Sequence, residues 1–196
     1  MEFTNQKTSE PSDEFLCARA CAGERGAEEL LVVRYQRLTR ACARPYFLAG
    51  GDSEDLIQEA MIGLLKAIRE YDPRRGVSFH AFAEVCVRNR IRSAVTAAAR
   101  GKYAPLNHSV PLDLAVQGRE DSPEELFISR EEEAERLEQV NQRLSPLERQ
   151  ILALYLQGFS YRDIGLQAGR PAKSVDNAVQ RIRRKVAQLY GGFSES

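Results

Sequence analysis

Hydrophobic residues recur at helical spacing through residues 55–68, and this amphipathic segment is the clearest pattern in the chain. An advance of about 100° per residue places seven apolar side chains on one broad face: Leu56, Ile57, Ala60, Met61, Leu64, Leu65 and Ile68. The opposite face is polar, except that Ile62 lies in the middle of it. An isolated exposed isoleucine is often merely tolerated, and the alternative is that this face docks a partner protein. Periodicity alone leaves both interpretations open.

The same period predicts helices along most of the chain, which we therefore expect to be all-α. Cap and turn residues mark the ends of these helices. Residues that can cap a helix precede three of them: Ser12, Asp52 or Ser53, and Ser160. Their side chains accept hydrogen bonds from the free backbone N–H groups of the first turn. Ser145-Pro146-Leu147-Glu148 combines a cap, proline at the first position and a capping-box glutamate. We expect helices at about 13–22, 27–45, 53–71, 79–99, 146–158, 161–168 and 172–190.

The helix expected at 27–45 carries a row of arginines on the side opposite its apolar stripe. They are Arg34, Arg37, Arg40 and Arg44. Rows of charge on a helix are usually in contact with solvent. We therefore interpret most of these arginines as a solvated face.

The formal net charge is zero, but the charges are strongly segregated along the chain. Residues 88–102 contain five basic residues and no acid, residues 120–138 contain nine acids and two arginines, and residues 143–190 contain nine basic residues and three acids. Pro105 and Pro111 suggest an extended linker before the acidic tract. We expect one domain at 13–104, a linker at 105–129 and a second domain at 130–190. The acidic tract is either a solvated face or a segment that avoids or mimics nucleic acid.

One face of the helix expected at 79–99 mixes aromatic, amide and arginine side chains. Arginine contacts phosphate, asparagine reads base edges, and aromatic rings stack on unpaired bases. The candidate DNA-contacting residues are Phe79, Phe82, Val85, Arg88, Asn89 and Arg92. For Phe79 and Phe82 the alternative is that each belongs to the hydrophobic core.

The last two expected helices form a helix-turn-helix, with the turn at Gly169-Arg170-Pro171. The first turn of the final helix presents Lys173, Ser174 and Asn177 to base edges. Arg181 and Arg184 lie further along the helix, where the phosphates of bound DNA would be. This motif favours DNA binding without specifying a biological role.

The composition argues against an enzyme, a cofactor protein or a membrane protein. His80 and His108 are the only histidines, and no phosphate-binding loop, metal-ligand spacing or nucleophile motif is present. The four cysteines, Cys17, Cys21, Cys42 and Cys86, form no metal pattern and are expected to be reduced thiols. The sequence contains no apolar run long enough for a membrane span, and we expect a cytoplasmic protein without a cofactor or metal.

Taken together, these residues resemble the sigma factors of bacterial RNA polymerase from about Asp13 to Tyr190. The residues that resemble region 2 are Asp55-Leu56-Ile57-Gln58-Glu59, Ile62-Gly63-Leu64, Tyr71-Asp72, Phe79-His80-Ala81-Phe82-Ala83 and Arg88, and Leu144 to Val186 resemble region 4. Other stretches resemble the sporulation sigma-H group: Tyr46-Phe47-Leu48, Gly51, Phe82-Ala83-Glu84, Pro105-Leu106-Asn107 and Ser174-Val175-Asp176-Asn177-Ala178.

The resemblance implies an alternative sigma factor that binds core polymerase and promoter DNA. Its polymerase contacts would be the β′ clamp helices and the β flap, and an anti-sigma factor is a further partner that it allows. The residues implied for binding the clamp helices are Asp55, Gln58, Glu59, Ile62, Gly63 and Lys66. The helix at 79–99 would recognise and melt the minus-ten element, the final helix would read the minus-thirty-five element, and the linker would run through core polymerase.

The chain also departs from the primary sigma factors. They carry paired tryptophans in the melting helix, where this chain has Val85 and Cys86, so we expect weaker autonomous melting. Lys173-Ser174 likewise predicts a different minus-thirty-five preference. The alternative to a sigma factor is a stand-alone helix-turn-helix regulator that binds DNA without polymerase.

Overall fold

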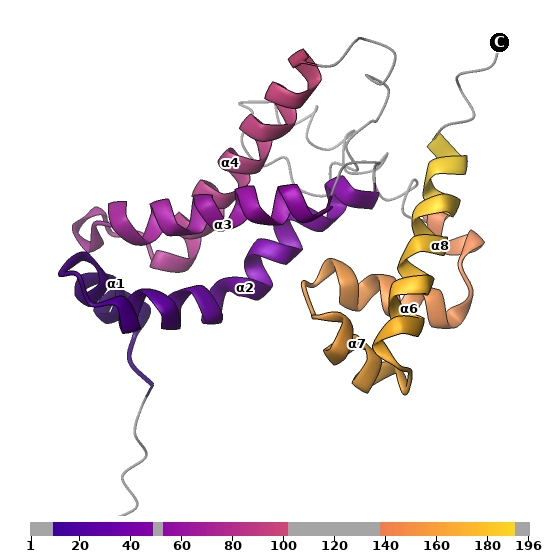
Figure 1. Cartoon of the computed structure of the whole chain (residues 1–196), viewed down its shortest axis with the longest axis horizontal. Coiled ribbons are helices and arrows are strands. Elements are labelled where there is room, and N and C mark those ends of the chain that lie inside the picture. The colour runs from indigo at the N-terminus through magenta and orange to yellow at the C-terminus, as the bar shows by residue number, and fades with distance from the viewer. Residues whose placement is uncertain (1–9, 49–52, 102–137, 191–196) are drawn as a thin grey trace, which may run out of the picture.

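The computed structural model describes residues 10–48, 53–101 and 138–190. Every regular element within these ranges is a helix, which confirms the expected all-α class (Figure 1). The N-terminal module contains α1 (Asp13–Cys21), α2 (Arg25–Leu48), α3 (Ser53–Glu70), the short 3-10 helix η1 (Pro73–Arg75) and α4 (Phe79–Gly101). The C-terminal module contains α6 (Pro146–Leu156), α7 (Tyr161–Ala168) and α8 (Ala172–Tyr190).

The N-terminal module is built around α3, which packs against both α2 and α4. Its apolar face is fully buried at Ala60, Leu64 and Ile68, as the helical period predicts. Leu31 from α2 and Val87 from α4 complete the same core. Burial of this stripe therefore fixes which face of α3 is left toward solvent.

The C-terminal module has its own core, to which α6, α7 and α8 all contribute. Ile151 of α6, Ile164 of α7 and Val179 of α8 are all buried in one cluster. Gly169 turns the chain between α7 and α8 with a φ of 62°, a left-handed conformation that glycine adopts without steric cost. The expected helix-turn-helix is therefore present.

Three of the expected helix caps are present. The Ser12 hydroxyl accepts a hydrogen bond from the Phe15 N–H at 3.2 Å, and Ser160 caps α7 through the Asp163 N–H. Ser145 and Glu148 form the reciprocal capping box. Each involves residues three positions apart, so the local sequence is enough to predict it.

One expected boundary is wrong, because α2 continues through Pro45 to Leu48 instead of ending near the proline. A proline inside a helix removes one backbone hydrogen bond and crowds the preceding turn. Here it lies in the last turn of α2, where few further bonds depend on it. The linker at 105–129 and almost all of the acidic tract lie outside the described residues.

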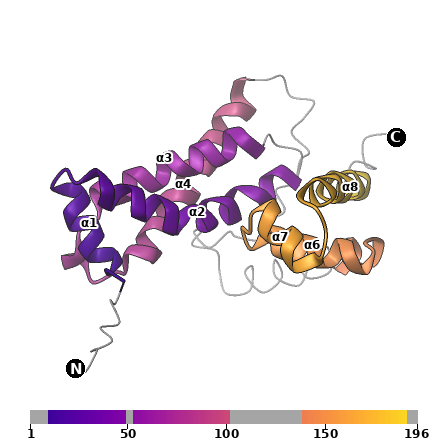
Figure 2. The ribbon, with the colours of Figure 1, turned by 60° about the horizontal axis from the view of Figure 1, so that its bottom comes forward.

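The two modules contact each other where α2 meets α6 and α8. In both views the C-terminal half of α2 extends toward the C-terminal module (Figures 1 and 2).

Within the described ranges, no helix is both long and apolar enough to cross a membrane.

Candidate protein- and nucleic-acid-binding surfaces

The outer face of α3 presents one large apolar side chain among polar ones. Ile62 is 47 % exposed, and Asp55, Gln58 and Lys66 are exposed on the same helix. Because Leu64 on the inner face is fully buried, packing holds the helix in this orientation. The structure thus brings four of the six expected docking residues to solvent.

The other two expected docking residues lie toward α4. Glu59 is half-buried and forms an ion pair with Arg90, with an Nε–Oε2 distance of 2.5 Å. Gly63 is buried, and a Cβ atom added there would lie 3.0 Å from both the Arg90 Cβ and the Val87 Cα. Gly63 is therefore a packing residue that lets α3 and α4 approach, and it is not exposed for the clamp-helix contact that the resemblance implies.

Three of the six expected minus-ten residues form an exposed row on α4, namely Val85, Asn89 and Arg92. Val85 is an exposed apolar side chain, and Arg92 Nη1 lies 3.5 Å from the Asn89 amide oxygen. An apolar group, an amide and a guanidinium group along one face can contact bases and phosphates together.

Phe79 does not belong to this face. It is fully buried, and its ring packs edge-on between Tyr35 and Tyr71, at centroid distances of 5.0 and 5.3 Å. The expectation that Phe79 contacts DNA is therefore wrong. At the start of α4 its side chain points toward α2, and aromatic edge-to-face packing stabilises it there.

Phe82 and Arg88 lie at the border of the exposed row, and both are half-buried. The Phe82 ring packs against Tyr71 at 5.9 Å. The Arg88 guanidinium group donates to the Glu84 carboxylate at 2.6 and 2.9 Å. Glu84, one turn earlier, was missed as a partner, although the i, i+4 spacing is readable in the sequence. Any phosphate contact by Arg88 must compete with this carboxylate.

The start of α8 presents the second expected DNA surface. Lys173, Ser174 and Asn177 are exposed in its first turns, and the Lys173 ammonium group donates to Asp176 at 3.0 Å. Arg184 is exposed further along and lies 3.4 Å from the Gln180 carbonyl oxygen. The first turns of α8 thus offer uncharged and charged donors of the kinds that contact base edges, and arginine follows further along the helix.

Glu148 of α6 underlies this surface, and sequence reasoning placed it only in the capping box. Its carboxylate accepts from Lys185 at 2.7 Å and lies 3.6 Å from Arg181 Nε. Burial opposes its ionisation, but hydrogen bonds from Lys185 and Ser145 outweigh burial and lower the pKa of Glu148 to about 2. The carboxylate is therefore charged and fixes the basic side of α8 against α6.

The chain thus combines two helical modules, one ending in a helix-turn-helix, with exposed arginines on α4 and α8, and this arrangement is typical of a two-module DNA-binding protein. Residues 31–101 match the family model of sigma-70 region 2, and residues 134–186 match that of sigma-70 region 4. The chain belongs to the sigma-70 family of sigma factors and is similar to the sigma-H factors within it.

Two relatives match nearly the whole chain. The RNA polymerase sigma-H factor of Bacillus licheniformis is 39 % identical over 94 % of this chain and 89 % of its own length. That of Bacillus subtilis strain 168 is 37 % identical over 94 % of this chain and 91 % of its own. A solved structure of the sigma-H factor from Fusobacterium nucleatum is 31 % identical and covers 72 % of this chain and 98 % of that one, with a TM-score of 0.34.

Proposed function

We propose that this chain is an alternative sigma factor that binds core RNA polymerase and directs it to a particular set of promoters. Membership of the sigma-70 family supports this role, as do the separate surfaces on α3, α4 and α8. The role needs no catalytic group, since the subunit acts by binding the polymerase and reading DNA.

Polymerase docking is assigned to the outer face of α3. The observation that carries this assignment is the exposure of Ile62 at the centre of a polar face, on a helix whose opposite face is buried at Ala60, Leu64 and Ile68. Asp55, Gln58 and Lys66 surround it. An apolar centre with a charged rim is the usual composition of a specific protein interface. We propose the β′ clamp helices as its partner, and the β flap as the partner of the C-terminal module.

Promoter contacts are divided between α4 and α8. The exposed Val85, Asn89 and Arg92 would hold the minus-ten element, with Phe82 and Arg88 at the border. Base–aromatic stacking is worth about 1–3 kcal/mol per base, and Phe82 already packs on Tyr71. This arrangement supports the expectation that melting depends strongly on a good promoter. The first turns of α8 would read the minus-thirty-five element in the major groove.

Substitution of Ile62 by aspartate tests the docking assignment. A buried charge without a partner is costly at the centre of an interface, so we expect I62D to weaken core polymerase binding by at least tenfold. The matched control is L30D, because Leu30 is also a large apolar residue on an exposed helix face, at 54 % against 47 % for Ile62. Glu59 is left unchanged, because its ion pair with Arg90 joins α3 to α4.

Binding is measured by fluorescence anisotropy with purified core polymerase, and circular dichroism checks that both variants remain folded. The proposal predicts that L30D binds as the wild type does. Equal binding by I62D and the wild type would rule out the α3 face as the docking surface. A wild-type chain that binds promoter DNA but not core polymerase would instead identify a stand-alone regulator.

A further inference from the structure

The middle of α4 carries three arginines that differ in how they are held: Arg88, Arg90 and Arg92. Arg90 is paired through Nε with Glu59 of α3, on the side of α4 that packs against that helix. Arg92 is exposed at the end of the row described above. Of the three, only Arg88 places two nitrogen atoms on one carboxylate, that of Glu84. This difference bears on what Arg88 can contact in DNA.

The Glu84 carboxylate occupies one edge of the Arg88 guanidinium group. Its Oε1 accepts from Nη2 at 2.6 Å and from Nε at 2.9 Å. A guanidinium group has a second edge with two parallel N–H donors, because Nη1 and Nη2 each carry two hydrogens. Within the part of the chain that the structure describes, Nη1 donates to no other group. Arg88 is therefore held at one edge and open at the other.

Helix spacing and partial burial both restrain this pair. Glu84 and Arg88 lie one turn apart, where side chains on a helix surface meet. Each side chain is only 34 % exposed. A guanidinium group held in this way has less rotamer freedom to lose on binding than a free arginine side chain.

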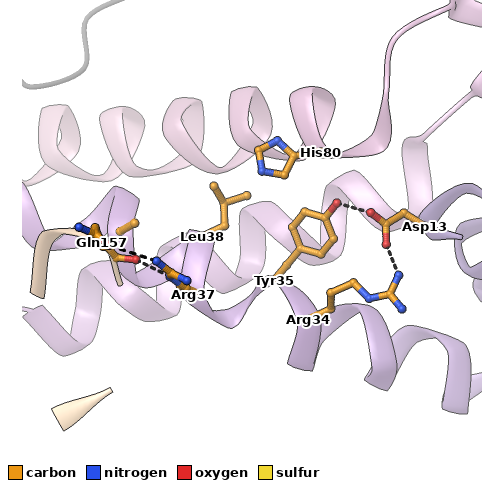
Figure 3. Close-up of a pocket in the computed structure, with 8 residues that line it drawn as sticks. Asp13, Arg34, Tyr35, Arg37, Leu38, His80 and Gln157 are labelled. Atoms are coloured by element: carbon orange, nitrogen blue, oxygen red, sulfur yellow. Dashed lines mark hydrogen bonds and ion pairs between the residues drawn. The ribbon is translucent and has the colours of Figure 1, made fainter. Parts of the chain in front are cut away.

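The pair lies between α2 and the exposed row of α4. His80, one turn before Glu84, packs against Tyr35 of α2 at a ring-centroid distance of 5.8 Å (Figure 3). Further along α2, burial raises the pKa of Cys42 to about 11, and Arg88 and Glu84 add smaller, opposite effects, so this thiol lies near both. On its other side, Arg88 is about 40° around the helix axis from the last residue of the row. Its open edge can therefore act together with the row.

The open edge of Arg88 matches the major-groove edge of guanine. Guanine presents two acceptors there, O6 and N7, and a pair of arginine N–H donors is their commonest specific partner. A phosphate is a poorer partner at this position, because the Glu84 carboxylate places a like charge beside it. Guanine is neutral and meets no such repulsion. The carboxylate thus favours a base contact over a backbone contact.

We propose that Arg88, positioned by Glu84, reads a guanine in the minus-ten element. This proposal rests on the proposed function, in which α4 contacts that element, and it adds the base that one side chain selects. Glu84 is a positioning residue, since it acts through Arg88. A held guanidinium group leaves its donors unpaired against a wrong base, whereas a free arginine turns to a phosphate. Specificity at this position therefore depends on the pair and not on Arg88 alone.

Selection from a promoter library tests which base is read. The full-length protein is assembled with core polymerase and bound to duplexes that are randomised across the minus-ten region, and the bound DNA is sequenced. We expect the wild type to prefer guanine at one position by about tenfold or more over the other bases. R88K keeps the charge but not the paired N–H edge, so it should lose this preference.

E84Q tests the positioning role. Glutamine keeps the size and an acceptor oxygen of Glu84 but removes its charge, so Arg88 is released to phosphates. We expect the guanine preference to fall by about threefold or more at the position that R88K affects. Binding to sequences without that guanine should become more salt-dependent, by the slope of about one phosphate contact.

E24Q is the matched control, because Glu24 also holds an arginine of the N-terminal module, Arg19 of α1. It should leave the selected sequences unchanged, and circular dichroism checks that every variant is folded.

The outcomes separate this proposal from the proposed function. A wild type that selects promoters without a guanine in the minus-ten region, or an R88K variant that keeps the wild-type preference, would overturn base reading by Arg88. A preference lost in R88K but unchanged in E84Q would overturn the role of Glu84. If the wild type selects no sequence with core polymerase, the proposed function itself fails.

Discussion

At the scale of single residues, Glu148 shows how one side chain can both cap a helix and join two helices. Its carboxylate closes the capping box by accepting from the Ser145 N–H at 2.9 Å. The same carboxylate receives Lys185 and lies beside Arg181. Since the side chain is only 7 % exposed, these contacts are little screened by solvent. The residue joins the start of α6 to the helix that carries the proposed minus-thirty-five contacts.

We predict that E148Q destabilises the C-terminal module by about 2–3 kcal/mol at neutral pH. The pKa of Glu148 is lowered from 4.5 to about 2 in the folded protein. A carboxylate with a depressed folded pKa contributes stability above its unfolded pKa and loses that contribution as the pH falls toward the folded value. The difference between E148Q and the wild type should therefore be full above about pH 5 and shrink between pH 4.5 and pH 2.

Urea unfolding at pH 7 and pH 3 measures this difference. The matched control is E138Q, because Glu138 is an exposed acid near the same module. Its substitution should have little effect at either pH. A destabilisation by E148Q that is equal at both pH values would show that shape or packing, and not the charge, is responsible.

The sequence predicted which side chains of α4 are exposed correctly at some positions and wrongly at others. The sequence grouped Phe79 with Val85 as candidate DNA contacts, but Phe79 is buried and Val85 is exposed. The helical period gives only the angles between the side chains of α4, and it does not say which of them face the core. Whether an aromatic residue at the helix start packs inward depends on Tyr35 and Tyr71, which lie on other segments.

At the scale of whole elements, α2 shows the limit of reading a helix by itself. The sequence correctly indicated a long helix with an arginine-bearing side. It interpreted most of that side as solvated, yet three of its arginines contact the end of α6 or the residues just after it, and Arg44 is buried. Only Arg34 pairs within the N-terminal module, with Asp13. Charge on a helix face predicts polarity but does not identify the partner.

The packing of α3 on α4 leads to a prediction at Gly63. A Cβ atom there would lie 3.0 Å from the Val87 Cα, so the two backbones must move apart. Overpacking of this kind costs typically about 1–3 kcal/mol, which outweighs the roughly 1 kcal/mol that alanine gains over glycine in a helix. We therefore expect G63A to lower the free energy of unfolding of the N-terminal module.

G26A is the matched control, because Gly26 is also helical and has no heavy atom within 4 Å of the added Cβ position. Urea unfolding should show unchanged or higher stability for G26A and lower stability for G63A. The same sign for both variants would contradict the packing role. The sequence resemblance grouped Gly63 with Ile62 as a docking residue, although one helical step of about 100° already separates the two.

At the scale of the whole molecule, local signals were predictable and the arrangement of the modules was not. The caps at Ser12, Ser145 and Ser160 each involve partners three residues away. The helix-turn-helix follows from one contiguous segment. In contrast, the hydrogen bonds between the modules join residues 111 to 120 positions apart, and no periodic pattern records a contact at that separation.

The uneven charge layout leads to a prediction for the whole chain. Residues 120–138 contain nine acids and two arginines, and residues 143–190 contain nine basic residues and three acids. Because both belong to one chain, the acidic tract has a high effective concentration near the basic helices. It should therefore compete with DNA phosphates for the C-terminal module, and most strongly at low ionic strength.

We expect E131Q/E132Q/E133Q to raise the affinity of the free full-length protein for non-promoter duplex DNA by about threefold to tenfold at 50 mM salt. The control E10Q/E14Q/E29Q removes the same charge from the N-terminal part of the chain and should raise affinity less. Fluorescence anisotropy across a salt series measures both, and the difference should vanish near 0.5 M because screening lengths fall to a few ångströms. Equal gains for the two variants would show that only net charge matters, whereas a larger gain for the tract variant would show that its position in the chain restrains DNA binding.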